Sequence, residues 1–287
     1  MNLEAETLFL MKKYNITANK NYGQNFLIDE NAVEEIIYSS EISKTDLVIE
    51  IGPGLGTLTS KLLEKAGKVI CIELDSKMIT VLNDRFSLYN NFELLHEDVL
   101  KVDLNSLIDL NLKKSNLIKC KVVANLPYYI TTPIIMKLLE EKLHLASITV
   151  MVQKEVALRL TDVPGGKDCG AITYTIHYYS NPKMILNVPK SSFIPAPKVD
   201  SAVIKLDILE NNNFNITNEK LFFQIIKYAF MQKRKTLLNS LTNSKIASKE
   251  TLEKMLLSLK LNPSIRAERL SIEDFVNISN YLDTNNF

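Results

Sequence analysis

The stretch Val122-Val123-Ala124-Asn125-Leu126-Pro127-Tyr128-Tyr129 joins an apolar, β-branched run to a proline turn. Because Pro127 cannot donate to a sheet ladder, the run is predicted to be a buried strand that ends at Asn125. An amide and an aromatic ring then stand at the strand end. Taken alone, these residues fit an ordinary Asn-x-Pro turn better than a catalytic site.

The same groups suit chemistry on an exocyclic amine of adenine. The lone pair of that amine is delocalised into the ring, which makes it a poor nucleophile. Two acceptors on its hydrogens, the Asn125 side-chain oxygen and a backbone carbonyl of the turn, would localise the lone pair. Tyr128 could hold the base by stacking. No strong base is then required, since the proton can leave after an incoming group has been transferred.

A second strand, Leu47–Ile51, is followed by the turn Gly52-Pro53-Gly54-Leu55-Gly56 and a helix to about Ala66. A strand, a glycine turn and a helix N-terminus together admit a nucleotide-like ligand close to the backbone. A dinucleotide fingerprint requires glycine at the sixth position of the turn, where this chain has Thr57. The spacing disfavours a pyrophosphate and suits a cofactor without phosphates; a purely structural turn is the alternative.

Acidic residues follow the next two predicted strands. The strand Lys68–Asp75 ends in Glu73 and Asp75. We expect Glu73 to accept hydrogen bonds from ribose hydroxyls, and Asp75 to cap the following helix. Asp98 comes after a short strand at 92–95 and could accept from an adenine amine, with Val99 against the ring.

In an open α/β sheet, ligands bind beyond the carboxyl ends of the strands. Gly52, Glu73, Asp98 and Asn125 should therefore open onto one crevice. Four such positions at four successive strand ends are much stronger support for a site than any one of them.

The remaining pattern predicts two domains. Strands near 147–152, 184–188 and 201–206 complete a seven-stranded, Rossmann-like α/β sheet with helices on both faces, over residues 1–209. The polar segment 210–215 leads to a small all-helical domain, 210–287, with a modest excess of lysine and arginine. Residues 1–20 show no firm pattern, which allows partial disorder.

Two further segments could contribute to the site. Asp29 is a plausible helix N-cap, and the preceding Gln24-Asn25 pair could either cover a polar ligand or form a loop pinned to the core. Phe193 lies in the proline-stiffened segment 191–200, where its ring could sandwich a base against Tyr128. A core phenylalanine beneath a proline loop is the alternative.

The composition limits the cellular location and the cofactors that we expect. Three widely spaced cysteines give neither a disulfide framework nor a zinc pattern. No apolar run approaches the roughly 20 residues of a membrane span, and the N-terminus has no signal-peptide pattern. We expect a cytoplasmic protein, a monomer without metal or membrane association.

The chain resembles the bacterial small-subunit rRNA adenine N6,N6-dimethyltransferases, over about residues 22–281. The motifs that carry the resemblance are 23–27 (GQNFL), 50–56 (EIGPGLG), 125–128 (NLPY), 193–201 (FIPAPKVDS), 234–237 (RKTL) and 266–271 (RAERLS). The chain departs from the usual pattern at Tyr22, where phenylalanine is common, at Cys169, where an aromatic residue is frequent, and at Lys233, a position that is often arginine.

The resemblance implies S-adenosylmethionine as the cofactor. Asn25 and Leu27 would close over its methionine part, and Gly52 would lie against it. Glu73 would hold the ribose, Asp98 the adenine amine, and Asn125 would adjoin both the methyl donor and the target amine. In the turn, Leu126 would supply the backbone carbonyl ahead of Pro127. Tyr128 and Phe193 would hold the target base. The implied substrate is a pair of adjacent adenosines in the hairpin near the 3′ end of 16S rRNA, modified during maturation of the 30S subunit.

Three alternatives remain at this stage. The chain could act mainly as a ribosome-assembly factor, with methylation secondary. It could belong with the large-subunit rRNA adenine methyltransferases, which share the motifs of the first domain. A nicotinamide-dependent oxidoreductase is disfavoured by Thr57.

Overall fold

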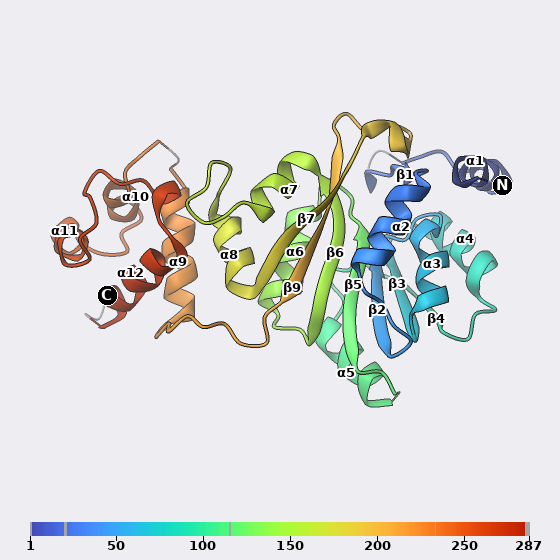
Figure 1. Cartoon of the computed structure of the whole chain (residues 1–287), viewed down its shortest axis with the longest axis horizontal. Coiled ribbons are helices and arrows are strands. Elements are labelled where there is room, and N and C mark those ends of the chain that lie inside the picture. Colours follow the sequence, from blue (N-terminus) through green and yellow to red (C-terminus); the bar gives the residue numbers. More distant parts are fainter. Residues whose placement is uncertain (1, 20–21, 115, 233, 285–287) are drawn as a thin grey trace. The chain divides into compact units, whose positions relative to one another are not determined.

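The computed structural model describes residues 2–19, 22–114, 116–232 and 234–284 (Figure 1). The chain forms two compact units. The first comprises Met1–Ala157 and Pro182–Ile208, and the second comprises Leu158–Asn181 and Leu209–Phe287. In the described residues, no helix is long and apolar enough to cross a membrane.

A seven-stranded sheet forms the centre of the first unit, with the strand order β4-β3-β2-β5-β6-β9-β7. The strands are β2 (Asp46–Ile51), β3 (Lys68–Glu73), β4 (Phe92–His96), β5 (Lys119–Asn125), β6 (Leu145–Gln153), β7 (Ser180–Val188) and β9 (Ser201–Ile208). Strands β2 to β6 run parallel to one another, whereas β9 runs antiparallel to β6. The seven-stranded α/β sheet expected from the sequence is confirmed.

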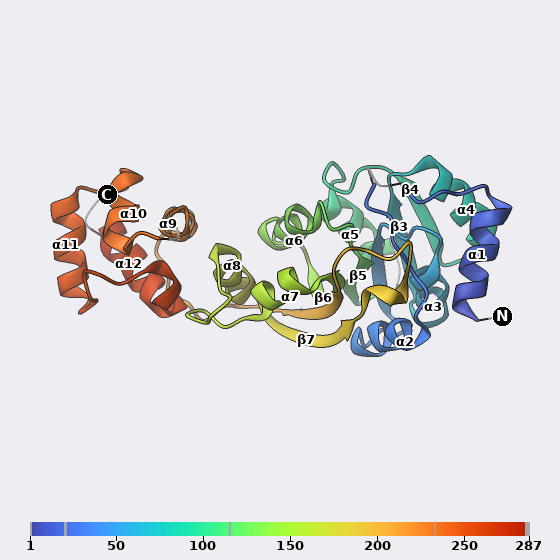
Figure 2. The same ribbon diagram turned by 90° about the horizontal axis from the view of Figure 1, so that it is seen from above.

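Helices cover both faces of this sheet. Helices α2 (Glu30–Ser39), α3 (Thr57–Lys65) and α4 (Ser76–Phe86) share a hydrophobic core with one face. Figure 2 shows α5 (Leu104–Lys114) and α6 (Thr131–Glu140) on the other side of the sheet from α2 and α3. Asp29 caps α2 and Asp75 caps α4 through backbone N–H groups, as their positions in the sequence predict.

The N-terminal residues differ from expectation. Leu3–Lys13 form helix α1, so the expectation of partial disorder in this region is wrong for these residues. Asn2 caps the helix by accepting from Ala5 N, Leu10 is buried in the core, and Glu6 pairs with Arg85 at 2.5 Å. The burial of Leu10 and the pairing of Glu6 with Arg85 depend on distant segments, which explains why a local pattern does not reveal the helix.

The second unit is helical and has its own core. It contains α8 (Ala171–Tyr179), α9 (Glu219–Phe230), α10 (Leu237–Asn243), α11 (Lys249–Ser258) and α12 (Ile272–Thr284), while α7 (Lys154–Thr161) crosses the boundary at 157/158. Tyr174 of α8 packs edge-on against Phe275 of α12, with ring centroids 4.9 Å apart.

Residues 158–181 therefore belong with the helical unit, although the sequence-based division at 209/210 had assigned them to the sheet domain. The physical reason is the apolar face of α8. Tyr174 and Tyr178 are buried in the helical core, where Tyr178 lies 5.4 Å from Phe222 between ring centroids. Burying aromatic surface of this size outweighs proximity in sequence.

Candidate active site

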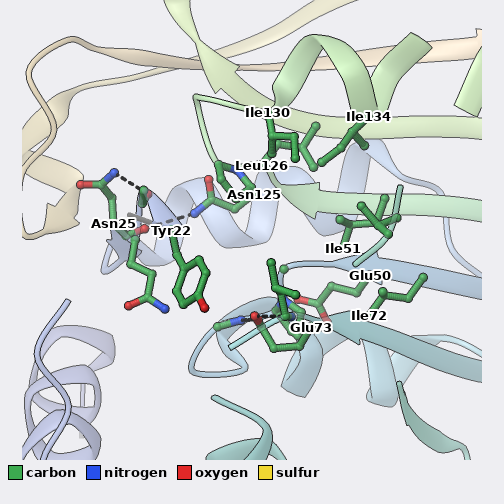
Figure 3. A pocket seen from close by; sticks show the side chains of 18 of the residues that line it. Tyr22, Asn25, Glu50, Ile51, Ile72, Glu73, Asn125, Leu126, Ile130 and Ile134 are labelled. Carbon is green, nitrogen blue, oxygen red and sulfur yellow. Dashed lines mark hydrogen bonds between the residues drawn. The ribbon is translucent and has the colours of Figure 1, made fainter. Parts of the chain in front are cut away.

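A single cleft in the first unit collects the polar strand ends (Figure 3). Its empty volume is about 1070 Å³ including the open mouth. It is lined by the following residues expected from the sequence: Asn25, Leu27, Gly52, Glu73, Asp98, Asn125, Leu126, Pro127 and Tyr128. They meet because β2, β3, β4 and β5 are parallel neighbours whose carboxyl ends share one edge.

Side chains of α4 pack against the glycine turn that follows β2. Gly56 has a φ of +83°, and a Cβ atom there would lie 2.3 Å from the Phe86 ring, so the position requires glycine. Arg85, the residue before that phenylalanine, donates to the carbonyl of Leu55. This support from α4 fixes the backbone that a cofactor would approach.

Glu73 ends β3 and is 8% exposed. One carboxylate oxygen, Oε1, accepts from the backbone N–H groups of Leu74 and Asp75 at 2.8 and 2.9 Å. The other, Oε2, accepts from Gly54 N at 3.2 Å. Burial raises the pKa of Glu73, and these backbone hydrogen bonds oppose the shift. Oε2 keeps a second lone pair, so the side chain can still accept from a ligand hydroxyl.

Asp98 lies at the end of the next strand, beyond β4. Its Oδ1 accepts from Leu100 N at 3.0 Å, and its own N–H donates to Glu97. These local bonds hold the carboxyl group at the cleft, where Val99 is also a lining residue. Oδ2 has no hydrogen-bond partner among the described residues, so it is available to a ligand amine.

The turn after β5 presents two acceptors. Asn125 donates from Nδ2 to the carbonyl of Asn25 at 3.4 Å, which orients its side-chain oxygen away from that contact. The carbonyl of Pro127 is engaged by Ile130 N at 3.2 Å and Thr131 Oγ1 at 3.1 Å. Leu126 donates its N–H to Met151, but its carbonyl has no partner among the described residues. Within the Asn-Leu-Pro part of the turn, the Asn125 amide oxygen and the Leu126 carbonyl are the acceptors that have no partner among the described residues.

Tyr128 stands at the same edge with its ring half-buried. Its hydroxyl and that of Ser201, at the start of β9, are 2.5 Å apart. Burial raises the pKa of Tyr128, and the hydrogen bond with Ser201 opposes the shift. The phenol therefore stays neutral near pH 7, and the ring is held at a fixed angle.

Phe193 is not brought to the cleft. It is 3% exposed, belongs to the hydrophobic core of the first unit, and is absent from the described residues that line the cleft. Its strand β8 (Phe193–Ile194) pairs with β1 (Phe26–Leu27), which places Phe193 opposite Leu27. Its position corresponds to the core alternative rather than to a sandwich with Tyr128.

The N-terminal segment 22–28 forms one wall of the cleft. Gln24 donates to Asp75 Oδ2 at 2.7 Å, and Asn25 donates from its side chain to Gly23 O at 3.0 Å. Ile28 N donates to Ser192 O at 2.9 Å. The segment thus lines the cleft and is also pinned to neighbouring segments, so both interpretations of the Gln24-Asn25 pair fit the structure.

Glu50 lines the cleft as well, although sequence reasoning did not single it out. It is 1% exposed, and its Oε2 accepts from Thr59 Oγ1 at 2.6 Å and from Cys71 Sγ at 3.4 Å. Burial raises its pKa from 4.5 to about 7. An acid inside a strand, at a position where the pattern expects an apolar side chain, is the signal that could have revealed it.

The electrostatic character of the cleft is acidic. Glu50, Glu73, Asp75 and Asp98 form no ion pair with any described lysine, arginine or histidine. Buried acids without a cationic partner favour a ligand that carries positive charge. The described residues contain no group of His, Cys, Asp or Glu side chains that could hold a metal ion.

The parallel sheet, the glycine turn after its first strand and the Asn-Leu-Pro-Tyr turn define a Rossmann-like methyltransferase. Residues 15–284 match the family described as Ribosomal RNA adenine dimethylase, and the chain belongs to that family.

Relatives and solved structures agree with this assignment. The chain is 49% identical to "Ribosomal RNA small subunit methyltransferase A" of Clostridium botulinum strain Langeland, over 94% of this chain and 96% of the relative. It is 46% identical to the protein of that name from Clostridium acetobutylicum, over 96% and 98% of the two chains. Its structure is similar to a dimethyladenosine transferase from Plasmodium falciparum, with a TM-score of 0.77 and 28% identity over 91% and 98%. The 23S rRNA methyltransferase ErmE, at 22% identity and a TM-score of 0.69 over 90% and 100%, shares the fold.

Proposed function

We propose that this enzyme transfers methyl groups from S-adenosylmethionine to N6 of two adjacent adenosines in the hairpin near the 3′ end of 16S rRNA, giving N6,N6-dimethyladenosines during maturation of the 30S subunit. The observation that carries the proposal is the pair of free acceptors, Asn125 Oδ1 and Leu126 O, at the edge of an acidic cleft. The small-subunit name of relatives at 45–49% identity supports the choice of substrate.

The negative charge of the cleft is complementary to the positive groups of the proposed cofactor. S-adenosylmethionine carries a sulfonium and an ammonium group, and the acids of the cleft have no cationic partner among the described residues. A pyrophosphate would be repelled by the same acids. Glu73 and Asp98 would accept from the ribose and the adenine amine, while Asn25, Leu27 and Gly52 would enclose the methionine part. When bound, the cofactor supplies a methyl group on a cationic sulfur, which is open to direct displacement.

Asn125 would orient the target amine. Its Oδ1 and the Leu126 carbonyl accept the two hydrogens of the target amine, which localises the lone pair and directs it at the methyl group. Pro127 makes the turn rigid, and its own carbonyl is already engaged within the turn. The methyl–sulfur bond would break as the methyl–N6 bond forms, leaving neutral S-adenosylhomocysteine and a cationic N6. The proton would then pass to water, so no side chain has to act as a strong base.

Tyr128 would hold the flipped base by stacking, which offsets the few kcal/mol, roughly, of unstacking it. The bond to Ser201 keeps the ring in one orientation. Phe193 would act indirectly in the structure as described, because it supports the Leu27 wall through β8 instead of meeting the base.

The test is methyl transfer to particles that lack the modification. Purified protein is incubated with radiolabelled methyl donor and 30S particles from an unmodified strain, and the nucleosides are then analysed. Label in N6,N6-dimethyladenosine from the 16S 3′ hairpin is expected. Naked 23S rRNA is incubated in parallel, and label there alone would assign the protein to the large-subunit enzymes. Absence of label from both would make an assembly role the leading account.

A further inference from the structure

Tyr129 is a residue of the cleft for which the proposed chemistry has no role. It follows Tyr128 in the turn after β5 and lines the cleft, yet 57% of its side chain is exposed. The turn holds its backbone, since Ile130 N donates to Pro127 O at 3.2 Å. A large aromatic ring thus stands at the mouth of the cleft on a rigid support.

The ring of Tyr129 packs on the backbone of the opposite wall. A Cβ atom added at Gly23 would lie 3.3 Å from Tyr129 Cδ1 and 3.7 Å from its Cε1. Gly23 has a φ of +60°, which favours glycine independently of that contact. The carbonyl of the same glycine accepts from the Asn25 side chain. The turn after β5 and the N-terminal wall therefore touch through the Tyr129 ring.

The charges around Tyr129 place it at the acidic end of the cleft. Burial raises its pKa, and the nearby ionisable groups of Asp98, Tyr22 and Glu73 raise it further. The hydroxyl therefore remains protonated at neutral pH and can act as a donor. Asp98 and Glu73 are the residues that would hold the adenosine part of the cofactor.

We infer that Tyr129 is a cofactor-binding residue, whose ring closes the adenosine end of the cleft against Gly23 and slows the departure of the bound cofactor. The inference rests on the proposed function, because it takes the S-adenosyl compounds as the ligands of this cleft. It assigns Tyr128 and Tyr129 to opposite tasks, one to the target base and one to the cofactor.

The mechanism of retention follows from the contact. A cofactor enclosed between the acids and the N-terminal wall can leave only when the ring separates from Gly23. Loss of the ring removes that step, so the dissociation rate should rise more than the association rate changes. The phenol hydroxyl adds at most one hydrogen bond, so its removal should have a smaller effect.

The experiment measures dissociation directly, without turnover. Full-length protein is loaded with radiolabelled S-adenosylmethionine, chased with excess unlabelled S-adenosylhomocysteine, and sampled by filter binding. Tyr129→Ala should raise the dissociation rate about five- to tenfold, and Tyr129→Phe about twofold or less. Tyr38→Ala is the matched control, because Tyr38 on α2 is 80% exposed and does not line the cleft.

Gly23→Ala provides an independent second variant. It leaves the tyrosine in place, but the added Cβ atom would displace the ring by a few tenths of an ångström, and the backbone with a φ of +60° would be strained. The backbone strain is the same with and without the ring, so the test is whether Tyr129→Ala speeds dissociation less in the Gly23→Ala background than in the wild type. Additive effects of the two substitutions would contradict closure through this contact.

The outcomes separate this inference from the proposed function. If wild-type protein binds neither S-adenosyl compound, the cofactor assignment itself fails. If the wild type binds but Tyr129→Ala dissociates at the wild-type rate, only the role of Tyr129 is overturned. An unchanged dissociation rate together with a raised KM for rRNA would show that Tyr129 contacts the RNA substrate and not the cofactor.

Discussion

The two edges of the central sheet both bury charged groups, but they use them differently. At the amino edge the charges pair: Lys121 with Asp46 at 3.0 Å, and Lys205 with Glu41 at 3.0 Å and Asp207 at 3.3 Å. At the carboxyl edge Glu50 and Glu73 are buried without a cationic partner among the described residues. The first edge is electrostatically complete within the protein. The acids of the second edge have only hydrogen-bond partners, which suits the cationic ligand proposed for the cleft.

The largest expected effect of a substitution is the loss of stability when the buried ion pair at the amino edge is disrupted. Lys121→Met removes the cation but keeps the length of the side chain, and it leaves Asp46 buried at 3% exposure without its partner. We expect a loss of about 3–5 kcal/mol in the free energy of unfolding. Affinity for S-adenosylhomocysteine should stay within about twofold in the protein that remains folded. Denaturant unfolding and calorimetry measure the two quantities.

Lys254→Met is the control for that substitution. Lys254 pairs with Glu250 at 2.8 Å, but its side chain is 68% exposed. Such a surface pair contributes about 0–1 kcal/mol, so the change should be small. Equal destabilisation by the two substitutions would contradict the assigned role of burial.

At the carboxyl edge the largest effect should come from Asn125→Ala. Loss of the orienting acceptor should lower kcat by about 100-fold or more, because the target amine is no longer held in line. The dissociation constant of S-adenosylhomocysteine should change by no more than about threefold, since other residues hold that ligand. Equal losses in turnover and in cofactor binding would show that Asn125 is mainly a cofactor ligand.

At the carboxyl edge, Glu50 should make the stability of the protein depend on pH. Its folded-state pKa is about 7 against 4.5 for an unperturbed group. Between these values the unfolded chain has lost the proton while the folded protein keeps it, so the stabilisation that Glu50 contributes is fully present below pH 4.5 and is lost as pH rises through 7. The free energy of unfolding should fall by about 3 kcal/mol over this window at about 1.4 kcal/mol per pKa unit.

Glu50→Gln removes that titration while keeping an acceptor for Thr59. The variant should lose the corresponding part of the pH slope in a series of unfolding curves between pH 4.5 and 8. An unchanged slope would assign the pH dependence to other groups, such as Glu73, whose charge also raises the pKa of Glu50.

The smallest of these effects is expected for Glu73→Gln. The single amide oxygen can accept either from Gly54 N or from the N–H groups of Leu74 and Asp75, but not from both sides, and the variant also loses the negative charge that strengthens a bond to a ribose hydroxyl. We expect the dissociation constant of S-adenosylhomocysteine to rise about tenfold, which corresponds to the loss of one charge-assisted hydrogen bond. Titration calorimetry gives the value. Glu253→Gln, on the exposed face of α11, should leave the constant unchanged.

The sequence by itself determined the strands, their turns and the residues at their carboxyl ends. Gly52, Glu73, Asp98 and Asn125 were predictable because a buried parallel strand is a local apolar run, and a polar residue that ends it is visible in the pattern. The parallel topology then brings those ends to one edge without any further information.

Only the tertiary structure decided which side chains are buried and what they touch. It placed Phe193 in the core, Glu50 among Thr59 and Cys71, Tyr129 over Gly23, and α8 in the helical unit. Each of these outcomes depends on packing between segments far apart in the chain. Propensity and periodicity act over a few residues, whereas burial and its effects on pKa arise from contacts that the order of residues alone does not reveal.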